Sequence, residues 1–324
     1  MPLHYFLEYL KKCQEYLAAI HKDEALSWPF LWIDSIWSFI IYGCTIRQYR
    51  YGHFYRLRHF ERRRVVTTRK YFKLIAINDK QSIHWLENKR DFNKMFSHFV
   101  HRDWLESSSM SFESFKALYM CSERLFIKPI EGTEGKGIRI LDCASTSINQ
   151  IREMFESLKG TNCIIEKAVL QHPQMEFNTK AVNTIRVLSI MDKATQEVTV
   201  FKTVIRIGNK DALVDNYHQG GCVYDIDINS GRICSSGISI SGETKVFHHG
   251  TDICMLGYQI PNWDMVIDSC MKAHKLLPSC RYIAWDVAIL NEGVELIEGN
   301  HRGDYDMIEF VGCGKWWPFL KQYL

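Results

Sequence analysis

The sequence has little proline, little net charge and no paired cysteine motif. Seven prolines and 19 glycines among 324 residues, with 46% hydrophobic and 24% charged residues, exclude a disordered or collagen-like chain. A chain of this length usually divides into two or three packed lobes. The net charge of +3 argues against a dedicated nucleic-acid-binding protein.

Cysteine is present without the spacing of a disulfide framework. There are 11 cysteines, an odd number, and no C-x-x-C pair occurs. The first residues do not resemble a cleavable secretory signal. We therefore expect free thiols and a cytoplasmic location.

The basic charge is concentrated near the N-terminus. Residues 47–73 contain ten Lys or Arg and one acid, Glu61, a balance of +9, so the other residues sum to −6. Aromatic residues alternate with these charges, which would suit anionic lipid or a charged polysaccharide precursor at the inner face of the membrane. A solvated face of an amphipathic helix fits the pattern equally well.

An apolar stretch precedes the basic segment. Residues 25–46 carry one charge, Asp34, and are long enough to raise the question of a membrane span. Asp34 and Pro29 argue against a span, because a carboxylate near the middle of a spanning helix costs about 3 kcal/mol. A packed helix and a helix lying on a membrane or a partner remain as interpretations, so residues 25–73 are a candidate membrane-surface or polysaccharide-assembly contact.

Periodicity predicts a helical start followed by a region rich in strands. Residues 1–70 have helical spacing, residues 74–77 suggest a strand, and helices are expected at 81–100, 112–120, 147–158 and 263–277. The β signals fall at 125–127, 137–141, 163–166, 184–191, 198–207, 222–228, 282–290 and 294–297. Many of these strands are joined by hairpin-length turns, so we predict an α+β fold with largely antiparallel sheets.

A glycine-rich turn lies between two of the predicted strands. Residues 124–141 read RLFIKPIEGTEGKGIRIL, with Lys128 ending the first strand and Gly132, Gly135 and Gly137 in the turn. The spacing fits neither a P-loop nor a dinucleotide-binding loop. A glycine hairpin can nevertheless wrap a polyphosphate, although a plain β-hairpin would have the same sequence signature.

Acidic residues cluster in a hairpin near the C-terminus. In YIAWDVAILNEGVELIEGN we expect a three-residue turn at 291–293, with Leu290 pairing with Val294. That register places Asp286 opposite Glu298, and Asn300 shares the face of Glu298 because side chains alternate along a strand. Two carboxylates and an amide suit Mg²⁺, which prefers oxygen ligands and completes its shell with water and phosphates.

Basic residues on the neighbouring strands are candidates for the same site. Period two places Lys202 and Arg206 on one face of their strand, and Arg186 lies in the strand before it. Cations beside a metal held by carboxylates are typical of phosphoryl transfer, although each residue could equally be a surface charge.

Taken in order along the chain, these motifs resemble the ATP-grasp superfamily of carboxylate–amine ligases. The stretches LQHPQMEFNTKAVNTIRV, VDNYHQGG and WDVAILNEGVELIEGN are similar to the sugar-transfer-associated ATP-grasp proteins of bacterial polysaccharide gene clusters. The resemblance implies that ATP lies between two α+β lobes, with a helical, basic extension at residues 1–75. Residues 76–168 would then contain a linker region and the small lobe, and residues 169–324 the large lobe.

The resemblance also implies roles for individual residues. Lys94 and Lys128 would hold phosphates under the loop that contains Gly132, Gly135, Lys136 and Gly137, and the strand end with Glu166, Lys167 and Val169 would receive adenine. Ribose would be bound by Glu176 or Gln174, and Mg²⁺ by Asp286, Glu298 and Asn300. D-alanine ligases have an Arg two residues before the metal Asp, where this sequence has Ala284. The Arg that stabilises the acyl phosphate would therefore come from elsewhere, with Arg186 the first candidate and Arg206 the second, and Lys202 is a further catalytic candidate.

The implied activity is ATP-dependent, ADP-forming amide synthesis. The substrates would be a carboxylate and an amine, one of them an uronic acid or an amino-acid substituent of a sugar in capsule or exopolysaccharide biosynthesis. Two alternatives remain: a kinase on the same fold, and a non-catalytic polysaccharide-assembly protein that binds nucleotide.

Overall fold

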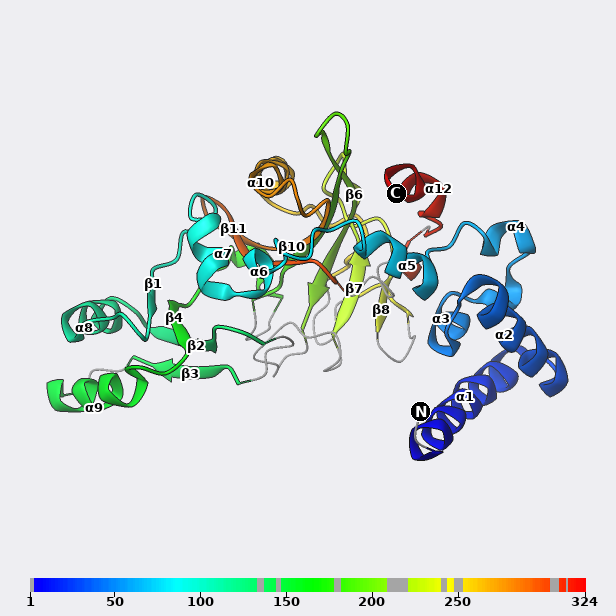
Figure 1. Ribbon diagram of the computed structural model, residues 1–324, viewed down its shortest axis with the longest axis horizontal. Helices are drawn as coiled ribbons and strands as arrows, with labels where there is room; N and C mark the ends of the chain where they lie inside the picture. The colour runs from blue at the N-terminus through cyan, green and yellow to red at the C-terminus, as the bar shows by residue number, and fades with distance from the viewer. Residues whose placement is uncertain are drawn as a thin grey trace. The chain divides into compact units, whose positions relative to one another are not determined.

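The structure, a computed structural model, divides the chain into two compact units (Figure 1). It describes residues 3–132, 137–143, 147–177, 182–208, 221–239, 244–247, 253–303, 309–312 and 314–324. One unit comprises Met1–Ile77 together with Asp304–Leu324, and the other comprises Asn78–Gly303. The ten cysteines in the described residues are all free.

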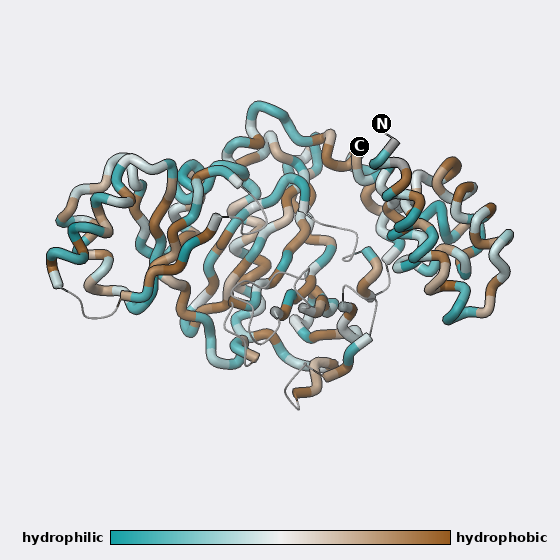
Figure 2. The backbone as a smooth tube through the Cα atoms, turned by 90° about the horizontal axis from the view of Figure 1, so that it is seen from below, coloured by the Kyte–Doolittle hydropathy of each residue, from teal (hydrophilic) through white to brown (hydrophobic). Residues whose placement is uncertain are grey.

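The N-terminal unit is helical, and its hydrophobic stretches are visible in Figure 2. Its buried cluster includes Leu17, Leu31, Tyr49 and Phe54, and Phe310 from the C-terminal segment packs against it. Its elements are α1 (Leu3–Glu24), α2 (Trp28–Tyr42), α3 (Ile46–Tyr51), η1 (Phe54–Arg56), α4 (His59–Arg62), α5 (Thr68–Ile75), α12 (Trp317–Leu320) and η4 (Lys321–Tyr323).

Two predicted elements near the unit boundary are wrong. Residues 74–77 do not form a strand, because Leu74 and Ile75 complete α5, where only Leu74 is buried. The helix predicted at 81–100 is interrupted, giving α6 (His84–Glu87) and α7 (Lys89–Met95). The break lies at Asn88, whose extended backbone ends α6 and whose side chain accepts a hydrogen bond from Asp91 N at the start of α7.

The second unit contains a four-stranded antiparallel sheet backed by two helices. Its strands are ordered β1-β4-β2-β3. Leu125, Ile127 and Ile165 on one face pack against α8 and α9, so the side chains of Lys128 and Glu166 belong to the opposite face. The elements are β1 (Trp104–Glu106), α8 (Phe112–Met120), β2 (Arg124–Pro129), β3 (Arg139–Asp142), α9 (Ile148–Leu158) and β4 (Cys163–Lys167).

A seven-stranded antiparallel sheet completes the second unit. Its order is β11-β10-β5-β6-β7-β8-β9, and the predicted α+β class with antiparallel sheets is confirmed. The short η2 (Pro173–Met175) precedes the first of these strands. The strands and the covering helix are β5 (Ile185–Met191), β6 (Val198–Ile207), β7 (Cys222–Asp225), β8 (Gly237–Ser239), β9 (Thr244–Lys245), α10 (Trp263–Leu276), β10 (Tyr282–Leu290) and β11 (Gly293–Asn300).

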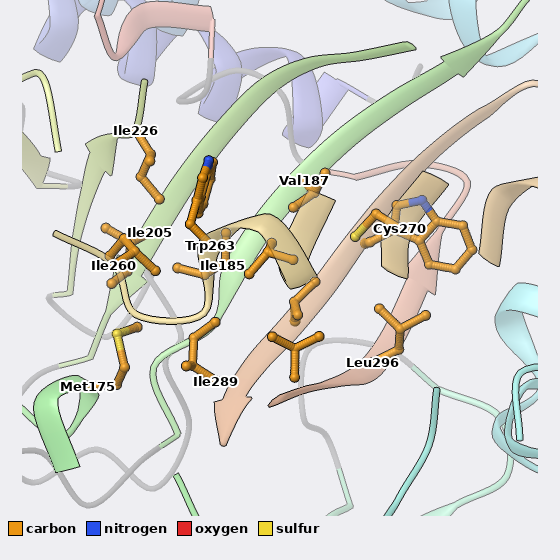
Figure 3. Close-up of a cluster of buried hydrophobic side chains, with 14 of the residues drawn as sticks. Met175, Ile185, Val187, Ile205, Ile226, Ile260, Trp263, Cys270, Ile289 and Leu296 are labelled. Carbon is orange, nitrogen blue, oxygen red and sulfur yellow. The ribbon is translucent and has the colours of Figure 1, made fainter. Parts of the chain in front are cut away.

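One face of this large sheet forms the main hydrophobic core. Ile185, Val187 and Ile205 of the sheet contact Trp263 and Cys270 of α10 in a single buried cluster, as Figure 3 shows. Side chains alternate between the faces of a strand, so the residues between these apolar positions point to the opposite face. That opposite face carries the polar residues described next.

Candidate functional site

The β10–β11 hairpin brings the predicted carboxylates together. Asp286 lies directly opposite Glu298, and Asn300 lies two residues further along β11, opposite Ala284. Asn300 Nδ2 donates to Glu298 Oε1 at 3.0 Å. The three oxygen-bearing side chains therefore share one face of the sheet.

The route to this register differs from the one predicted. Leu290 pairs with Gly293, not with Val294, so the turn has two residues and every pair near it is shifted by one. A β-bulge between the Asp286 and Val287 pairs leaves Ile297 unpaired and restores the predicted partners. Without the bulge, Glu298 would point to the apolar face, because a shift of one residue reverses the face of each side chain.

Two arginines neutralise Asp286. The Arg186 Nε donates to Asp286 Oδ1, the Arg186 Nη2 lies 2.9 Å from Oδ2, and the Arg206 Nη2 lies 2.9 Å from the same Oδ2. Burial alone would raise the pKa of Asp286, but the two guanidinium groups outweigh it and lower the pKa to about 2. Burial and the adjacent Asp286 carboxylate raise the pKa of Glu298. The pair thus holds one carboxylate with a lowered pKa beside one with a raised pKa.

Ala284 is surrounded too closely for a larger side chain. The backbone of Gly303 approaches so near that a Cβ added there would lie 2.4 Å from Ala284 Cβ and 3.1 Å from Arg186 Nη1. Arg186 lies directly opposite Asp286 on β5. The cation beside the carboxylate pair therefore comes from the neighbouring strand, and position 284 must stay small.

Lys202 faces the same side of the sheet but is directed elsewhere. Its amine lies 2.6 Å from Asp225 Oδ1 on β7, and both side chains are buried. In the sheet order β5 lies between β10 and β6, the strand that carries Lys202, and Asp225 lies one strand further away. Lys202 is thus part of an ion pair with β7, whereas Arg186 and Arg206 contact Asp286 directly.

Lys128 and Glu166 meet on the open face of the small sheet. Lys128 Nζ lies 2.5 Å from Glu166 Oε2, while Glu166 Oε1 accepts from Asn93 Nδ2 at 2.8 Å and from Arg102 Nη2 at 3.0 Å. Burial would raise the pKa of Glu166, but Arg102 and Lys128 outweigh it and hold the pKa well below its usual range. Glu166 is therefore a buried carboxylate held between the cations of Arg102 and Lys128.

Arg102 connects the two sheets. Its side chain is buried, and its Nη1 lies 2.6 Å from Glu295 Oε1 on β11 while its Nη2 contacts Glu166 on β4. The same Glu295 oxygen accepts from the backbone N–H groups of His101 and Arg102. The sequence signal that could have revealed this contact is Glu295 itself, an acid between the apolar residues Val294 and Leu296, which must find a partner when buried.

Lys89, which was not among the predicted residues, faces both halves of the site. Its Nζ donates to the Gly132 carbonyl at 2.8 Å. Burial lowers the pKa of Lys89, the Glu298 and Glu166 carboxylates oppose that shift, and the Lys128 ammonium adds to it. Lys89 therefore interacts electrostatically with groups from both sheets.

Lys94, the residue named from the sequence, points away from these groups. Its side chain is 58% exposed, and its amine lies 3.6 Å from Glu106 Oε2 on β1. Both lysines belong to α7, at its first residue and near its end, so their side chains leave the helix in different directions. The structure brings Lys89, and not Lys94, to the site.

The remaining predicted nucleotide contacts lie along the segment after β4 and in the glycine loop. Lys167 and Val169 are half-buried at and just beyond the end of β4, and Glu176 is exposed directly after η2. Gly132 has φ +129° and Gly137 has φ +78°, backbone angles that glycine adopts without strain. Gly135 and Lys136 lie outside the described residues.

The donor set fits the Mg²⁺ that the sequence resemblance implies. No cluster of three or more His, Cys, Asp and Glu side chains suited to a metal occurs in the described part of the chain, so an all-carboxylate cage is not formed there. Mg²⁺ is usually held by one or two carboxylates and keeps water and phosphate ligands. Asp286 and Glu298 supply two carboxylates and Asn300 supplies an amide oxygen. A cation bound there would relieve the repulsion that raises the pKa of Glu298.

Solved structures with similar backbones are ATP-grasp enzymes at low identity. The ATP-grasp ligase PsnB complexed with a phosphomimetic variant of its minimal precursor, Mg and ADP matches with a TM-score of 0.45 and 13% identity, over 76% of this chain and 60% of that chain. VanG D-Ala:D-Ser ligase from Enterococcus faecalis matches with a TM-score of 0.45 and 13% identity, over 76% and 63%. The D-alanine-D-alanine ligase from Coxiella burnetii matches with a TM-score of 0.42 and 9% identity, over 76% and 54%.

The chain thus spans less than two thirds of the length of these solved proteins. No curated protein matches it. Residues 66–313, well over half of the chain, match the family described as sugar-transfer associated ATP-grasp. The order of the sheets, the paired carboxylates and this match lead to one conclusion: the chain belongs to the sugar-transfer associated ATP-grasp family.

Proposed function

We propose that this protein is an ATP-dependent, ADP-forming ligase that joins a carboxylate to an amine. The observation that carries the proposal is the buried pair of carboxylates, Asp286 and Glu298, with Arg186 and Arg206 bound to Asp286. The small sheet, within residues 76–168, supplies Lys128 and the Gly132 backbone. The large sheet, within residues 169–324, supplies Arg186, Arg206 and the Asp286–Glu298 pair.

Separate parts of the site are suited to binding the phosphates, the adenine and the ribose of the nucleotide. Lys89 and Lys128 present ammonium groups near the glycine turn, where backbone N–H groups of small residues can approach phosphate oxygens. We assign the phosphate role first proposed for Lys94 to Lys89, because only Lys89 faces the turn. The strand end at Glu166, Lys167 and Val169 would receive adenine, and Glu176 or Gln174 the ribose.

The proposed reaction has two steps. A substrate carboxylate oxygen attacks the γ-phosphorus of ATP, and the bond between that phosphorus and the β-phosphate oxygen breaks. ADP departs, and the substrate is now an acyl phosphate. The amine nitrogen then attacks the acyl carbon, loses a proton and displaces inorganic phosphate, which leaves the amide. ATP is needed because a carboxylate is a poor electrophile and phosphate is a good leaving group.

The residues of the large sheet have separate parts in this scheme. Mg²⁺ bound by Asp286, Glu298 and Asn300 would neutralise charge on the transferred phosphoryl group. Arg186 and Arg206, positioned by Asp286, would stabilise the negative charge of the acyl phosphate. Lys202, paired with Asp225, would act through the local positive potential and not by contact.

The family description points to sugar metabolism as the setting. We propose that one substrate is an uronic acid or an amino-acid substituent of a sugar used in bacterial capsule or exopolysaccharide biosynthesis. The site would then operate in the cytoplasm, near the inner face of the membrane where such sugars are assembled. In the described residues, no helix is both long enough and apolar enough to cross a membrane.

The test is to incubate the protein with ATP, Mg²⁺ and crossed panels of uronic acids and amines, while measuring ADP release and the masses of the products. Amide formation coupled to ADP release supports the proposal. The variant Glu298→Gln should lower the rate by about 100-fold, since it removes a charge aimed at the phosphoryl group. The matched control is Glu292→Gln in the exposed turn of the same hairpin, which should retain the full rate.

Two outcomes would contradict the proposal. ADP release with a stable phosphorylated acceptor and no amide would make the protein a kinase. Tight nucleotide binding with no turnover over the whole panel would favour a non-catalytic assembly protein.

A further inference from the structure

Helix α2 has its apolar residues on the outside. It buries Leu31, Ser35, Ser38 and Tyr42 against the rest of the N-terminal unit. Ser35 and Ser38 are small and polar, whereas a helix of a globular protein normally turns its large apolar residues inward. The exposed residues, each at least 41% accessible, are Phe30, Ile33, Ile36, Trp37, Phe39, Ile40 and Ile41.

Polar contacts on the inner side fix this reversed orientation. Asp34 accepts from Arg62 Nη1 at 2.7 Å and from Tyr49 Oη at 2.7 Å. Arg62 Nη1 also donates to Ser38 Oγ at 3.2 Å, and Arg62 is buried. Rotating α2 to bury its apolar side would break these contacts and leave a guanidinium and a carboxylate without partners. The exposure of the apolar face of α2, defined by the seven residues above, is thus fixed by the packing of the unit.

The apolar face of α2 is larger than the apolar patches that are usual on the solvent-exposed surface of a protein. Single exposed apolar residues are common on soluble proteins, but a contiguous group of seven, including a Trp and two Phe, marks an interaction site. The helix is also too short to span a bilayer, since its 15 residues extend over about 22 Å while the hydrocarbon core is about 30 Å thick. The face must therefore be covered by something that lies along it.

Positive charge in the segment that follows α2 identifies what covers the apolar face. Arg69 donates to the carbonyl oxygens of Phe39, Ile40 and Ile41, which places its guanidinium at the C-terminal end of the face. Arg63, Arg64, Arg69 and Lys73 are all exposed, and within the described residues none of them forms an ion pair. The segment 47–73 that contains them carries a balance of +9.

We propose that the apolar face of α2 docks in the plane of a bilayer that contains anionic phospholipid. The apolar side chains would enter the boundary between headgroups and acyl chains, and Trp37 suits that boundary because its ring is amphipathic. The uncompensated cations would lie against the anionic headgroups, each adding roughly fivefold to the affinity. A symmetric dimer through this face is disfavoured, since it would bring two strongly basic segments together.

The experiment is vesicle sedimentation with the full chain. Vesicles of phosphatidylcholine with a minority of phosphatidylglycerol should bind the protein, and the partition coefficient should fall by at least about tenfold with phosphatidylcholine alone or at high salt. The double variant Ile33→Asn, Ile40→Asn should lose binding by about 100-fold, because two apolar residues no longer enter the bilayer. Both residues are exposed, so the variant should keep the thermal stability of the wild type.

The matched control replaces exposed apolar residues of the other unit. Met120→Asn and Leu170→Asn alter side chains that are 69% and 71% exposed and should leave vesicle binding unchanged. Lys128→Ala should also bind vesicles normally, which separates this proposal from the proposed nucleotide chemistry. Equal binding of wild type and the Ile33, Ile40 double variant would overturn the proposal. A second outcome would also overturn it: the wild type does not bind vesicles and is a dimer in analytical ultracentrifugation, and the double variant is a monomer.

Discussion

Lys89 and Lys94 lie on one short helix, and their amines face different charges. Lys89 donates to the Gly132 carbonyl and interacts with carboxylates of both sheets, whereas Lys94 pairs with Glu106 on the rim. We predict that Lys89→Ala weakens ATP binding by about 10- to 100-fold, the range expected when a hydrogen bond to a charged group is lost. Isothermal titration of the nucleotide measures this, with Lys94→Ala as the matched control that should retain the wild-type affinity. Equal losses in the two variants would show that both lysines bind phosphate.

A buried histidine sets a pH dependence of stability. His274 Nδ1 and Ser189 Oγ are 2.7 Å apart, His274 Nε2 contacts the Cys280 carbonyl, and Trp285 Nε1 donates to the same Ser189 oxygen. Burial lowers the pKa of His274 from 6.5 to about 4. Between these two pH values His274 is protonated in the unfolded chain and neutral in the folded chain, so acid favours unfolding.

We therefore predict that the stabilisation due to neutral His274 is complete above pH 6.5 and falls by about 3 kcal/mol as the pH drops to 4. Urea unfolding at several pH values measures this slope. His274→Leu removes the titrating group and should flatten the slope by that amount, while His4→Gln, a change at an exposed histidine, should preserve it. An unchanged slope in His274→Leu would contradict the assignment.

At this scale the sequence predicts the chemistry of side chains better than their direction. Asp286, Glu298, Asn300, Arg186 and Arg206 were all named from motif and strand alternation, and the structure brings them to one face. Lys89 was missed because the sequence does not show that a helix break at Asn88 aims it at the glycine turn. Arg102 was missed because nothing local to it indicates burial; its partners are 64 and 193 residues away.

Among the elements, β10 and β11 show how two errors can cancel. The predicted register of the hairpin was wrong at the turn, which has two residues, and right at the carboxylates, because the bulge at Ile297 restores it. Turn length and bulge position depend on packing over both faces of the sheet and are not determined by the hairpin sequence alone. Residues 74–77 were mistaken for a strand for a related reason: four apolar-rich residues are too few to distinguish period two from the end of a helix.

Arg102 offers a test of the link between the two sheets. Its removal would leave Glu166 and Glu295 buried with fewer partners, since both carboxylates are nearly inaccessible. We predict that Arg102→Met lowers the free energy of unfolding by about 3–5 kcal/mol. Chemical denaturation measures the change, and Arg90→Met is the control, because Arg90 is one-third exposed and its pairs with Asp91 and Glu106 should contribute little to stability. A loss below about 1 kcal/mol in Arg102→Met would mean that the network does not hold the sheets together.

For the whole molecule, the notable feature is that one unit is built from two distant stretches of chain. Glu309 is buried, and its Oε1 accepts from the backbone N–H groups of Val66, Lys315 and Trp316. Trp317 N donates to the Arg64 carbonyl, and Phe310 packs into the helical core. No local sequence pattern predicts this return of the chain, because the contacts join residues more than 240 positions apart.

We predict that Glu309→Ala destabilises the N-terminal unit by about 1–3 kcal/mol, since it leaves buried N–H groups without an acceptor. Hydrogen exchange followed by mass spectrometry should show faster exchange in α3 to α5, with ATP binding by the other unit unchanged. Gln322→Ala, which alters an exposed side chain, is the control. Faster exchange spread evenly over both units would contradict this division of the molecule.

The same discontinuity has a consequence for synthesis on the ribosome. Residues 78–303 form the second unit without interruption, so that unit can fold as soon as it emerges, whereas α1 to α5 must wait for residues 309–324. Translation proceeds at roughly 5–20 residues per second, so this wait lasts roughly 10–45 seconds. During that time α2 is part of a growing chain in which the C-terminal segment of its own unit has not yet been made. The unit whose synthesis begins second is thus completed first, and the nascent N-terminal helices have time to meet a membrane or a chaperone before their own partners arrive.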